Sequence, residues 1–296
     1  FGLMNTAFGA GSVAVGSQNN ASGTGSSAFG VANTASHTNS SAVGRSNSAT
    51  GENSSAVGFD NTANSVGSGA FGYSNIASGE TSSAFGFENE ASGLQSNAFG
   101  YSNVASGLAG SAYGYSNNAS GNMSNAFGYS NLADGSGSSA VGVLNSAVGG
   151  GSSAFGMQNN ALGNGSSAFG TLNFVDNDAS SAVGFSNTAM AAGSNAFGSY
   201  NTALGNFSSA FGAWSQVLDG TGDGTGSEYS IAIGGGDDAA TGARVGTASG
   251  NGSEAAIAIG FMAAVEDDAD YSIAMGAGAT VEAGVTDAVA LGSGSV

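Results

Sequence analysis

Few side chains in this 296-residue sequence are suited to chemistry. His37 is the only histidine, cysteine is absent, and only two residues are basic, so general-base, thiolate and most zinc chemistry lack their usual residues. No glycine-rich phrase ends in the Lys that would cradle a phosphate. His37 stands at a position that is otherwise mostly glycine (Gly23, Gly51, Gly79), which favours a solvated turn residue over a general base. We therefore expect the chain not to be an enzyme.

One stretch has the spacing of a metal-binding loop. Residues 219–228 read DGTGDGTGSE, and the carboxylates of Asp219, Asp223 and Glu228 could supply oxygen ligands to Ca²⁺. Neither an EF-hand loop nor the Gly-Gly-x-Gly-x-Asp nonapeptide is present. A hydrated acidic loop is the favoured alternative. Calcium is the only cofactor that the sequence suggests.

The charge of the chain restricts its partners. Asp and Glu number 20 against two Lys and Arg, a formal net charge of −18, which argues against nucleic acid and anionic membranes as partners. The apolar stretches are only a few residues long, so we expect no membrane insertion by this segment. Because 41% of residues are hydrophobic, 17 are Phe and none is Pro, disorder is disfavoured. The sequence opens on Phe1, and we expect it to be part of a longer protein.

The sequence is organised by a repeat of fourteen residues, which must position any functional side chain. The phrase SNAFGYSN occupies residues 96–103 and again 124–131, two periods apart, and a Gly recurs at every fourteenth position from Gly16 to Gly212. Ala and then Phe, Val or Tyr precede each of these glycines. Asn recurs at the same interval from Asn5 to Asn201, and a second Ala column from Ala7 to Ala203 is broken only at Val175. So short a period with local alternation predicts an all-β solenoid, one coil per repeat.

Geometry assigns these columns to places in the coil. One repeat at about 3.3 Å per residue, less two turns, allows two strands of roughly five residues around a lumen too narrow for rings. Alternation places Ala28 and Gly30 inside, and Ser27, Phe29 and Val31 outside. We expect the Asn column at a corner, in the left-handed conformation, with stacked amides forming a ladder.

The outward column forms an apolar row too long for a soluble monomer to expose. We therefore expect an obligate oligomer that buries this row. The aromatic members assigned to the interface are Phe29, Phe71, Phe85, Phe99, Tyr113, Phe127, Phe155, Phe169, Phe197 and Phe211. A second aromatic run, from Tyr73 to Tyr129, lies two residues further along each repeat. It could stack on sugars or grip surfaces, but an extension of the interface is favoured because it shares the face of the first column.

The repeat loosens beyond residue 212. Equivalent phrases, among them SIAIG (230–234) and SIAMG (272–276), begin at Ser230, Ala256, Ser272 and Ala288, at wider and unequal spacings. Twelve of the 20 acidic residues lie beyond residue 210. We predict a regular region, 1–212, and a continuation of the same solenoid with longer acidic loops, 213–296. The acids could reflect a saline or calcium-containing habitat, or could serve solubility alone.

The SIAIG and SIAMG phrases and the Ala-apolar-Gly coils before them resemble the YadA-like head of trimeric autotransporter adhesins, over essentially the whole chain. The resemblance implies a left-handed parallel β-roll, a homotrimer with the Phe column at its axis, and a bacterial cell-surface fibre anchored in the outer membrane through other parts. It also implies virulence-related adhesion to extracellular matrix, cells or abiotic surfaces. Phe replaces the family's usual Ile in most coils. A trimeric shaft of a phage tail fibre or filament is the main alternative, and the lack of an outward Thr column argues against ice binding.

Overall fold

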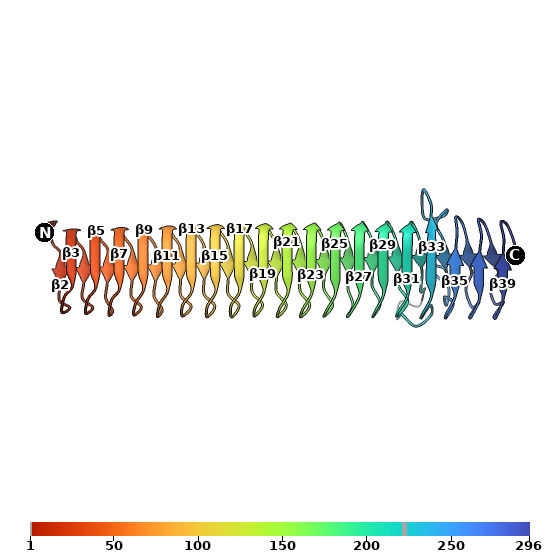
Figure 1. Ribbon diagram of the computed structural model, residues 1–296, viewed down its shortest axis with the longest axis horizontal. Helices are drawn as coiled ribbons and strands as arrows, with labels where there is room; N and C mark the ends of the chain where they lie inside the picture. Colours follow the sequence, from red (N-terminus) through yellow and green to blue (C-terminus); the bar gives the residue numbers. More distant parts are fainter. Residues whose placement is uncertain (1, 221–223) are drawn as a thin grey trace. The chain divides into compact units, whose positions relative to one another are not determined.

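The computed structural model describes residues 2–220 and 224–296, and in these residues all regular secondary structure is β-strand. The chain divides into two compact units, Phe1–Leu144 and Asn145–Val296. In each unit the regular coils contribute one long and one short strand, and neighbouring strands of each ladder pair in parallel (Figure 1). The predicted parallel β-solenoid, with one fourteen-residue repeat per regular coil, is therefore confirmed.

The first unit has two ladders of strands. Its odd-numbered strands are β1 (Gly2–Leu3), β3 (Val13–Ser17), β5 (Ser27–Val31), β7 (Ser41–Arg45), β9 (Ser55–Phe59), β11 (Gly69–Tyr73), β13 (Ser83–Phe87), β15 (Asn97–Tyr101), β17 (Ser111–Tyr115), β19 (Asn125–Tyr129) and β21 (Ser139–Val143). Its even-numbered strands are β2 (Thr6–Ala7), β4 (Asn20–Ala21), β6 (Thr34–Ala35), β8 (Ser48–Ala49), β10 (Thr62–Ala63), β12 (Ile76–Ala77), β14 (Glu90–Ala91), β16 (Val104–Ala105), β18 (Asn118–Ala119) and β20 (Leu132–Ala133).

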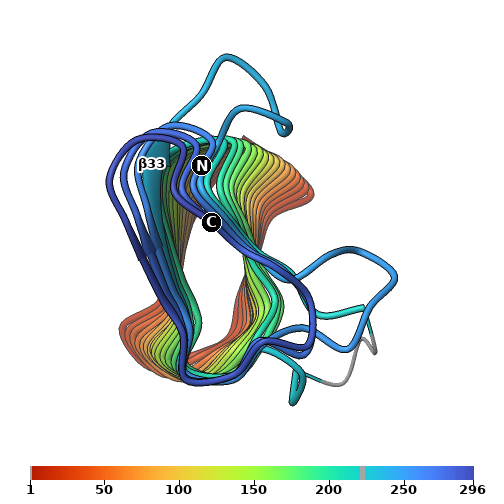
Figure 2. The ribbon, with the colours of Figure 1, turned by 90° about the vertical axis from the view of Figure 1, so that its right-hand side faces the viewer.

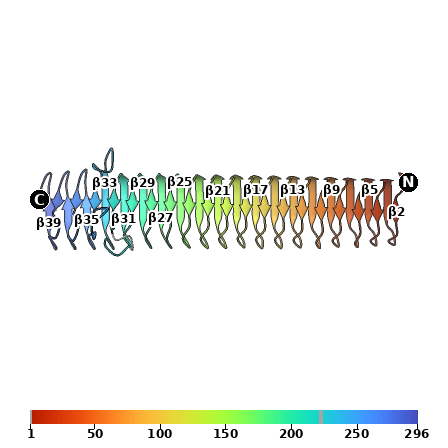
Figure 3. The ribbon, with the colours of Figure 1, turned by 180° about the vertical axis from the view of Figure 1, so that it is seen from behind.

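The second unit continues the numbering. Its even-numbered strands are β22 (Ser146–Ala147), β24 (Asn160–Ala161), β26 (Phe174–Val175), β28 (Thr188–Ala189), β30 (Thr202–Ala203), β32 (Gln216–Val217), β34 (Arg244–Val245), β36 (Ala264–Val265) and β38 (Thr280–Val281). Its odd-numbered strands are β23 (Ser153–Met157), β25 (Ser167–Thr171), β27 (Ser181–Phe185), β29 (Asn195–Ser199), β31 (Ser209–Ala213), β33 (Ile231–Gly235), β35 (Ile257–Ile259), β37 (Ile273–Met275) and β39 (Val289–Leu291). Figure 3 shows the ladders from behind.

The lumen is filled by the two Ala columns. Ala28, in the middle of β5, and Ala35, at the end of β6, are both fully buried, and the same holds for their equivalents in the coils that follow within the first unit. In these coils the two facing ladders place only methyl groups from these columns in the lumen, as the narrow lumen predicted. The second strand of each coil differs from the prediction, because it has two residues and not five.

The Gly column corrects a second expectation. Gly30 has φ of +118°, a conformation that only glycine adopts readily, and a Cβ placed on it would lie 2.0 Å from the carbonyl oxygen of Gly44 in the next coil. Gly30 is part-exposed and Gly72 is exposed, so this column does not line the lumen. The positive φ breaks the alternation of side chains on which the inward assignment rested.

The Asn column forms the predicted ladder, fully buried. Asn33 Nδ2 donates to Asn19 Oδ1 (3.0 Å), and also to the carbonyl oxygens of Phe29 (2.9 Å) and Gly44 (2.7 Å). The backbone N–H of Asn33 donates to Asn19 Oδ1 as well. The left-handed conformation was assigned to the wrong residue: the preceding residue adopts it, for example Ala32 with φ of +56°. Each Asn thus joins three successive coils.

Candidate interaction surface

The long strands of the first unit present a column of large apolar side chains to the outside. We call it the Phe column; its members in this unit are Val15, Phe29, Val43, Val57, Phe71, Phe85, Phe99, Tyr113, Phe127 and Val141. Parallel pairing without a register shift places each member directly beside the next. Phe85 is 53% exposed, and the five rings from Phe71 to Phe127 follow one another at centroid distances of 4.9–5.9 Å. The column lies outside its own coils, as the sequence predicted.

A second column of aromatic side chains runs along the same long strands, two residues further on in each repeat. We call it the Tyr column; it consists of Phe59, Tyr73, Phe87, Tyr101, Tyr115 and Tyr129. Successive ring centroids lie 4.6–5.0 Å apart and the ring planes differ by only 1–8°. The guanidinium of Arg45 extends the stack, with Cζ 5.5 Å from the centre of Phe59. Sequence reasoning missed this cation–π contact, although Arg45 occupies the same repeat position one coil earlier.

The stacking decides which part of the rings a partner can reach. In the interior of the Tyr column each ring covers the faces of its neighbours, so the outside meets ring edges and tyrosine hydroxyl groups. A sugar that stacks on an aromatic side chain needs an open ring face. The geometry therefore favours apolar packing against a protein surface over saccharide stacking along this column.

A third, small column lies beneath the rings of the Phe column. A Cβ built on Gly69 would lie 2.7 Å from Cε2 of Phe71, so this ring leans over the residue two positions before it. The equivalent positions carry only Ser or Asn in the neighbouring coils, for example Ser83 and Asn97. Across strands such as β15, a small side chain (Asn97) is therefore followed by two large ones (Phe99 and Tyr101).

The second unit carries shorter stretches of the same surface. Phe155 stacks with Phe169 at 5.1 Å, and Phe197 with Phe211 at 5.3 Å, in the Phe column of this unit. Val183 interrupts the aromatic members between them. At the corner that follows the long strands, Tyr200 stacks on Trp214 at 4.3 Å, a pair that sequence reasoning did not identify. All ten aromatic residues assigned to the interface lie on outward positions of long strands; their burial by other copies stays a prediction.

The predicted calcium ligands are only partly described. Asp223 lies outside the described residues. Asp219 is buried and its carboxylate accepts the backbone N–H of Gly224 at 2.5 Å, whereas Glu228 accepts Nδ2 of Asn206 at 3.1 Å. Among residues 2–220 and 224–296, no three His, Cys, Asp or Glu side chains are grouped as a metal site requires. Calcium binding by this loop stays a prediction.

His37 lies in an exposed turn. Its backbone N–H donates to Ser40 Oγ at 3.2 Å, and that hydroxyl donates to the carbonyl oxygen of His37 at 2.7 Å. The imidazole has Ser36 Oγ 3.4 Å from Nδ1. This arrangement closes a turn and is consistent with the solvated turn residue that the sequence favours.

Among the described residues, 2–220 and 224–296, the structure contains no helix with the length and hydrophobicity of a membrane span.

Comparison with known proteins identifies the repeat. The family model of the YadA head domain repeat matches residues 1–19, 21–47, 49–75, 66–89, 253–279 and 268–295. The chain carries YadA-like head domain repeats. The YadA head matches include coils of both units. Beyond residue 89 the first unit keeps the same strand pairing, for example Phe87 with Tyr101. The family is one of structural adhesins and is not known for enzymes. A search of curated protein sequences gave no significant match.

Proposed function

We propose that this chain is an adhesive head segment of a trimeric bacterial surface fibre, in which three copies pack through the Phe column. The observation that carries the proposal is the row of stacked aromatic rings, half-buried or exposed, on the outside of a solenoid with YadA-like head repeats. The Tyr column runs along the same long strands and extends the contact between copies. Burial of both columns contributes the large apolar side chains that the methyl-lined lumen lacks, at about 25 cal/mol per Å² removed from water.

The adhesive part of the proposal rests on the family. YadA head repeats belong to surface-exposed autotransporter adhesins of bacteria. We place this chain outside the cell, on such a surface, with extracellular matrix, host cells or abiotic surfaces as its targets. A trimer would present three copies of each outward side chain, and repeated weak contacts then add up to firm attachment.

A structural shaft is the second candidate. Its support is the uniformity of the first unit, where every coil from β3 to β21 has the same strand lengths and no inserted loop. Such regularity suits a rigid spacer in a fibre or phage tail, with no ligand of its own. The two functions share the assembly and differ only in binding.

Attachment of the purified chain distinguishes the two. The chain is applied to immobilised collagen, fibronectin, a glycan array and bare polystyrene, with bovine serum albumin as the negative control. Saturable binding to any of these above the control supports the adhesive head. An assembled trimer that binds none of them supports the shaft. A monomeric chain contradicts both.

A further inference from the structure

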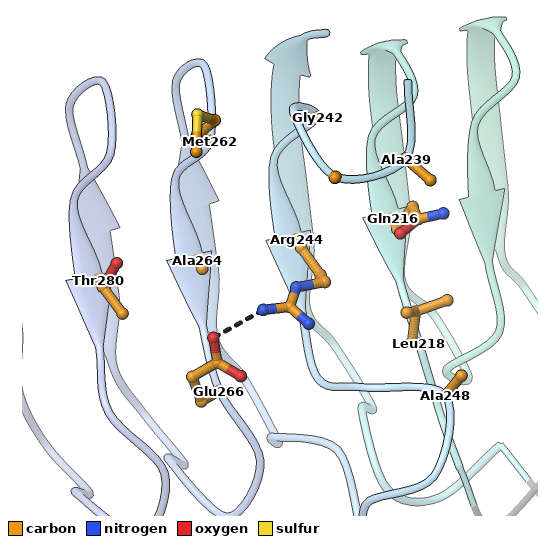
Figure 4. Close-up of a pocket in the computed structure, with 11 residues that line it drawn as sticks. Gln216, Leu218, Ala239, Gly242, Arg244, Ala248, Met262, Ala264, Glu266 and Thr280 are labelled. Atoms are coloured by element: carbon orange, nitrogen blue, oxygen red, sulfur yellow. Dashed lines mark hydrogen bonds and ion pairs between the residues drawn. The ribbon is translucent and has the colours of Figure 1, made fainter. Parts of the chain in front are cut away.

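The second unit contains a pocket of about 550 Å³, away from the aromatic face. Its floor is the outer surface of the short-strand ladder, where Gln216, Arg244, Ala264 and Thr280 are register partners on β32, β34, β36 and β38 (Figure 4). In the regular coils, register partners on neighbouring short strands are one repeat apart in sequence, but Gln216 and Arg244 are separated by twice that length. Among the inserted residues, Ala239, Ala240 and Gly242, between β33 and β34, line the pocket above this floor.

The loop between β33 and β34 forms one wall of the pocket. Figures 1 and 2 show it projecting beyond the neighbouring coils. It is fixed from within, because Asp238 Oδ1 accepts the N–H groups of Ala240 and Thr241 at 3.0 Å, and Thr241 Oγ1 accepts the N–H of Asp237 at 2.9 Å. Ala240 at the pocket rim is exposed.

The loop after β34 forms the opposite wall. Asp267 Oδ1 accepts the N–H of Thr247 at 2.8 Å and that of Gly252 at 3.2 Å, which ties this loop to the next coil. Ala248 and Leu218 both line the pocket. Because internal hydrogen bonds hold both walls, little conformational entropy is left to lose when a ligand binds.

The polar centre of the pocket is an ion pair. Arg244 Nη2 donates to Glu266 Oε1 at 2.6 Å, with both side chains about 30% exposed (30% and 28%). Arg244 is one of only two basic residues in a chain of net charge −18. The pair leaves further guanidinium N–H donors and the second carboxylate oxygen facing a cavity that also contains Gln216 and Thr280.

We propose that this pocket binds a neutral saccharide. An ion of either sign would have to compete with Glu266 or Arg244 for its partner, and an anion would also meet the negative field of the chain. Adjacent hydroxyl groups of a sugar, in contrast, both donate and accept, so they bridge Arg244 and Glu266 without separating them. The C–H face of the sugar fits the apolar lining from Leu218 and Met262. The volume lies within the range of small-molecule sites.

This inference does not depend on the assembly through the Phe column. The pocket lies on short strands, whereas the aromatic columns lie on long strands. Loss of the trimer by substitution of Phe99 and Phe127 in the first unit would therefore leave saccharide binding intact, and loss of saccharide binding would leave the trimer intact. Failure of one proposal is thus distinguishable from failure of the other.

Saturation-transfer difference NMR on the full chain tests the proposal. The probes are the methyl glycosides of galactose, glucose, mannose and N-acetylglucosamine, with methyl glucuronate and N-acetylneuraminic acid as anionic probes. We expect at least one neutral glycoside to bind. Arg244→Gln should weaken that binding tenfold or more. Ala240→Trp should abolish it by filling the pocket from an exposed loop, without touching the ion pair.

Arg45→Gln is the matched control, because it removes the only other basic residue and lies in the first unit. It should leave binding unchanged. Circular dichroism establishes whether each variant is folded. If Arg244→Gln is unfolded, Ala240→Trp alone tests the proposal. The proposal is overturned if no neutral glycoside binds, if only the anionic probes bind, or if the folded Ala240→Trp variant binds as the wild type does.

Discussion

In the second unit, two groups of coils use different hydrogen bonds at the corner that follows the long strand. In the coils from β23 to β31, the carbonyl oxygen of the strand glycine is bound by an Asn from the preceding coil: Asn159 Nδ2 donates to Gly170 O at 2.7 Å. In the coils of β35 and β37 the Asn is replaced by Ala263 and Ala279. There the backbone N–H of Ala263 donates to Gly260 O, and that of Ala279 to Gly276 O, each at 3.2 Å. A local turn thus replaces a ladder between coils.

The difference at the corner is accompanied by a difference in the length of the long strands on the outer surface. Where the turn forms, the long strand ends early: β35 and β37 have three residues, whereas β25 and β27 have five. A five-residue strand presents three side chains outward and a three-residue strand presents two. The third outward position is the one that the Tyr column occupies in the first unit. The buried Asn ladder is therefore associated with the strand length that provides a second outward aromatic column.

The lumen changes with the corner. Where Ser215 or an alanine replaces Asn, the second Ala column becomes Val217, Val245, Val265 and Val281, all buried. The first Ala column stays Ala in the same coils, at Ala232, Ala258, Ala274 and Ala290. A smaller side chain at the corner is thus accompanied by a larger one two residues later. Val175 shows that one Val is accommodated even where the Asn is kept.

The largest expected effect comes from enlarging the first Ala column. Ala98→Phe in the first unit places a ring in a lumen that accepts methyl groups, and we expect the neighbouring coils to unfold locally. Ala105→Val, in the second column, is the control and should cost only about 1–3 kcal/mol, because the equivalent position in another coil accommodates Val175. Hydrogen exchange of the flanking coils measures both. Equal protection in the two variants would show that the columns do not differ.

Removal of one Asn from the ladder should be the next most damaging change. Asn103→Ala leaves the carbonyl oxygens of Phe99 and Gly114 and the N–H of Asn117 without this partner. At about 1–3 kcal/mol for each of these three buried groups, we expect a loss of roughly 3–9 kcal/mol in unfolding free energy. Asn122→Ala, in an exposed turn, is the matched control and should change stability little. Urea titration measures the difference; similar values for both variants would contradict a structural role of the ladder.

The constant repeat made the Ala, Asn and Phe columns predictable, whereas the place of Gly30 and the pocket at Arg244 were not predicted. Ala28, Asn33 and Phe29 recur at constant intervals, so their burial, ladder and outward position followed from the period. Gly30 was misplaced because its positive φ interrupts alternation; its recurrence as glycine in every repeat was the signal for that conformation, which a rule of strict alternation ignores. The pocket at Arg244 could not be foreseen, because it depends on how two inserted loops without periodicity fold over the strands.

Salt should have a smaller effect on stability than these substitutions. Each copy carries a net charge of −18, so screening relieves repulsion within the assembly, and we expect the melting temperature to rise between about 0.01 and 0.15 M NaCl. Because Asp219 and Glu228 already accept protein N–H groups, we expect calcium to add no more than NaCl of the same ionic strength. A larger rise with calcium, reversed by chelator and absent in Asp219→Asn, would establish the predicted calcium site instead.

The smallest expected effect is a tyrosine titration in the acidic coils. The charge of Glu254 raises the pKa of Tyr271 above its usual 10.0, with smaller contributions from partial burial, a hydrogen bond to Glu254, Asp270 and Asp287. Because the folded state holds this proton more tightly than the unfolded state, the stabilisation is complete below pH 10 and is lost as pH rises through the raised pKa. Glu254→Gln should lower the midpoint of the tyrosinate absorbance titration, measured against Tyr271→Phe. Asp287→Asn should lower it less; the reverse order would contradict the assignment.

The mass of the assembly tests the central claim, that copies join through the Phe column, most directly. Sedimentation equilibrium of the wild type should give the mass of three chains. Phe99→Asp combined with Phe127→Asp should give the mass of one, whereas the control Leu108→Asp with Met123→Asp, which places the same charges on exposed turn positions, should stay trimeric. A double Phe variant that remains trimeric with unchanged thermal stability would contradict the role assigned to this column.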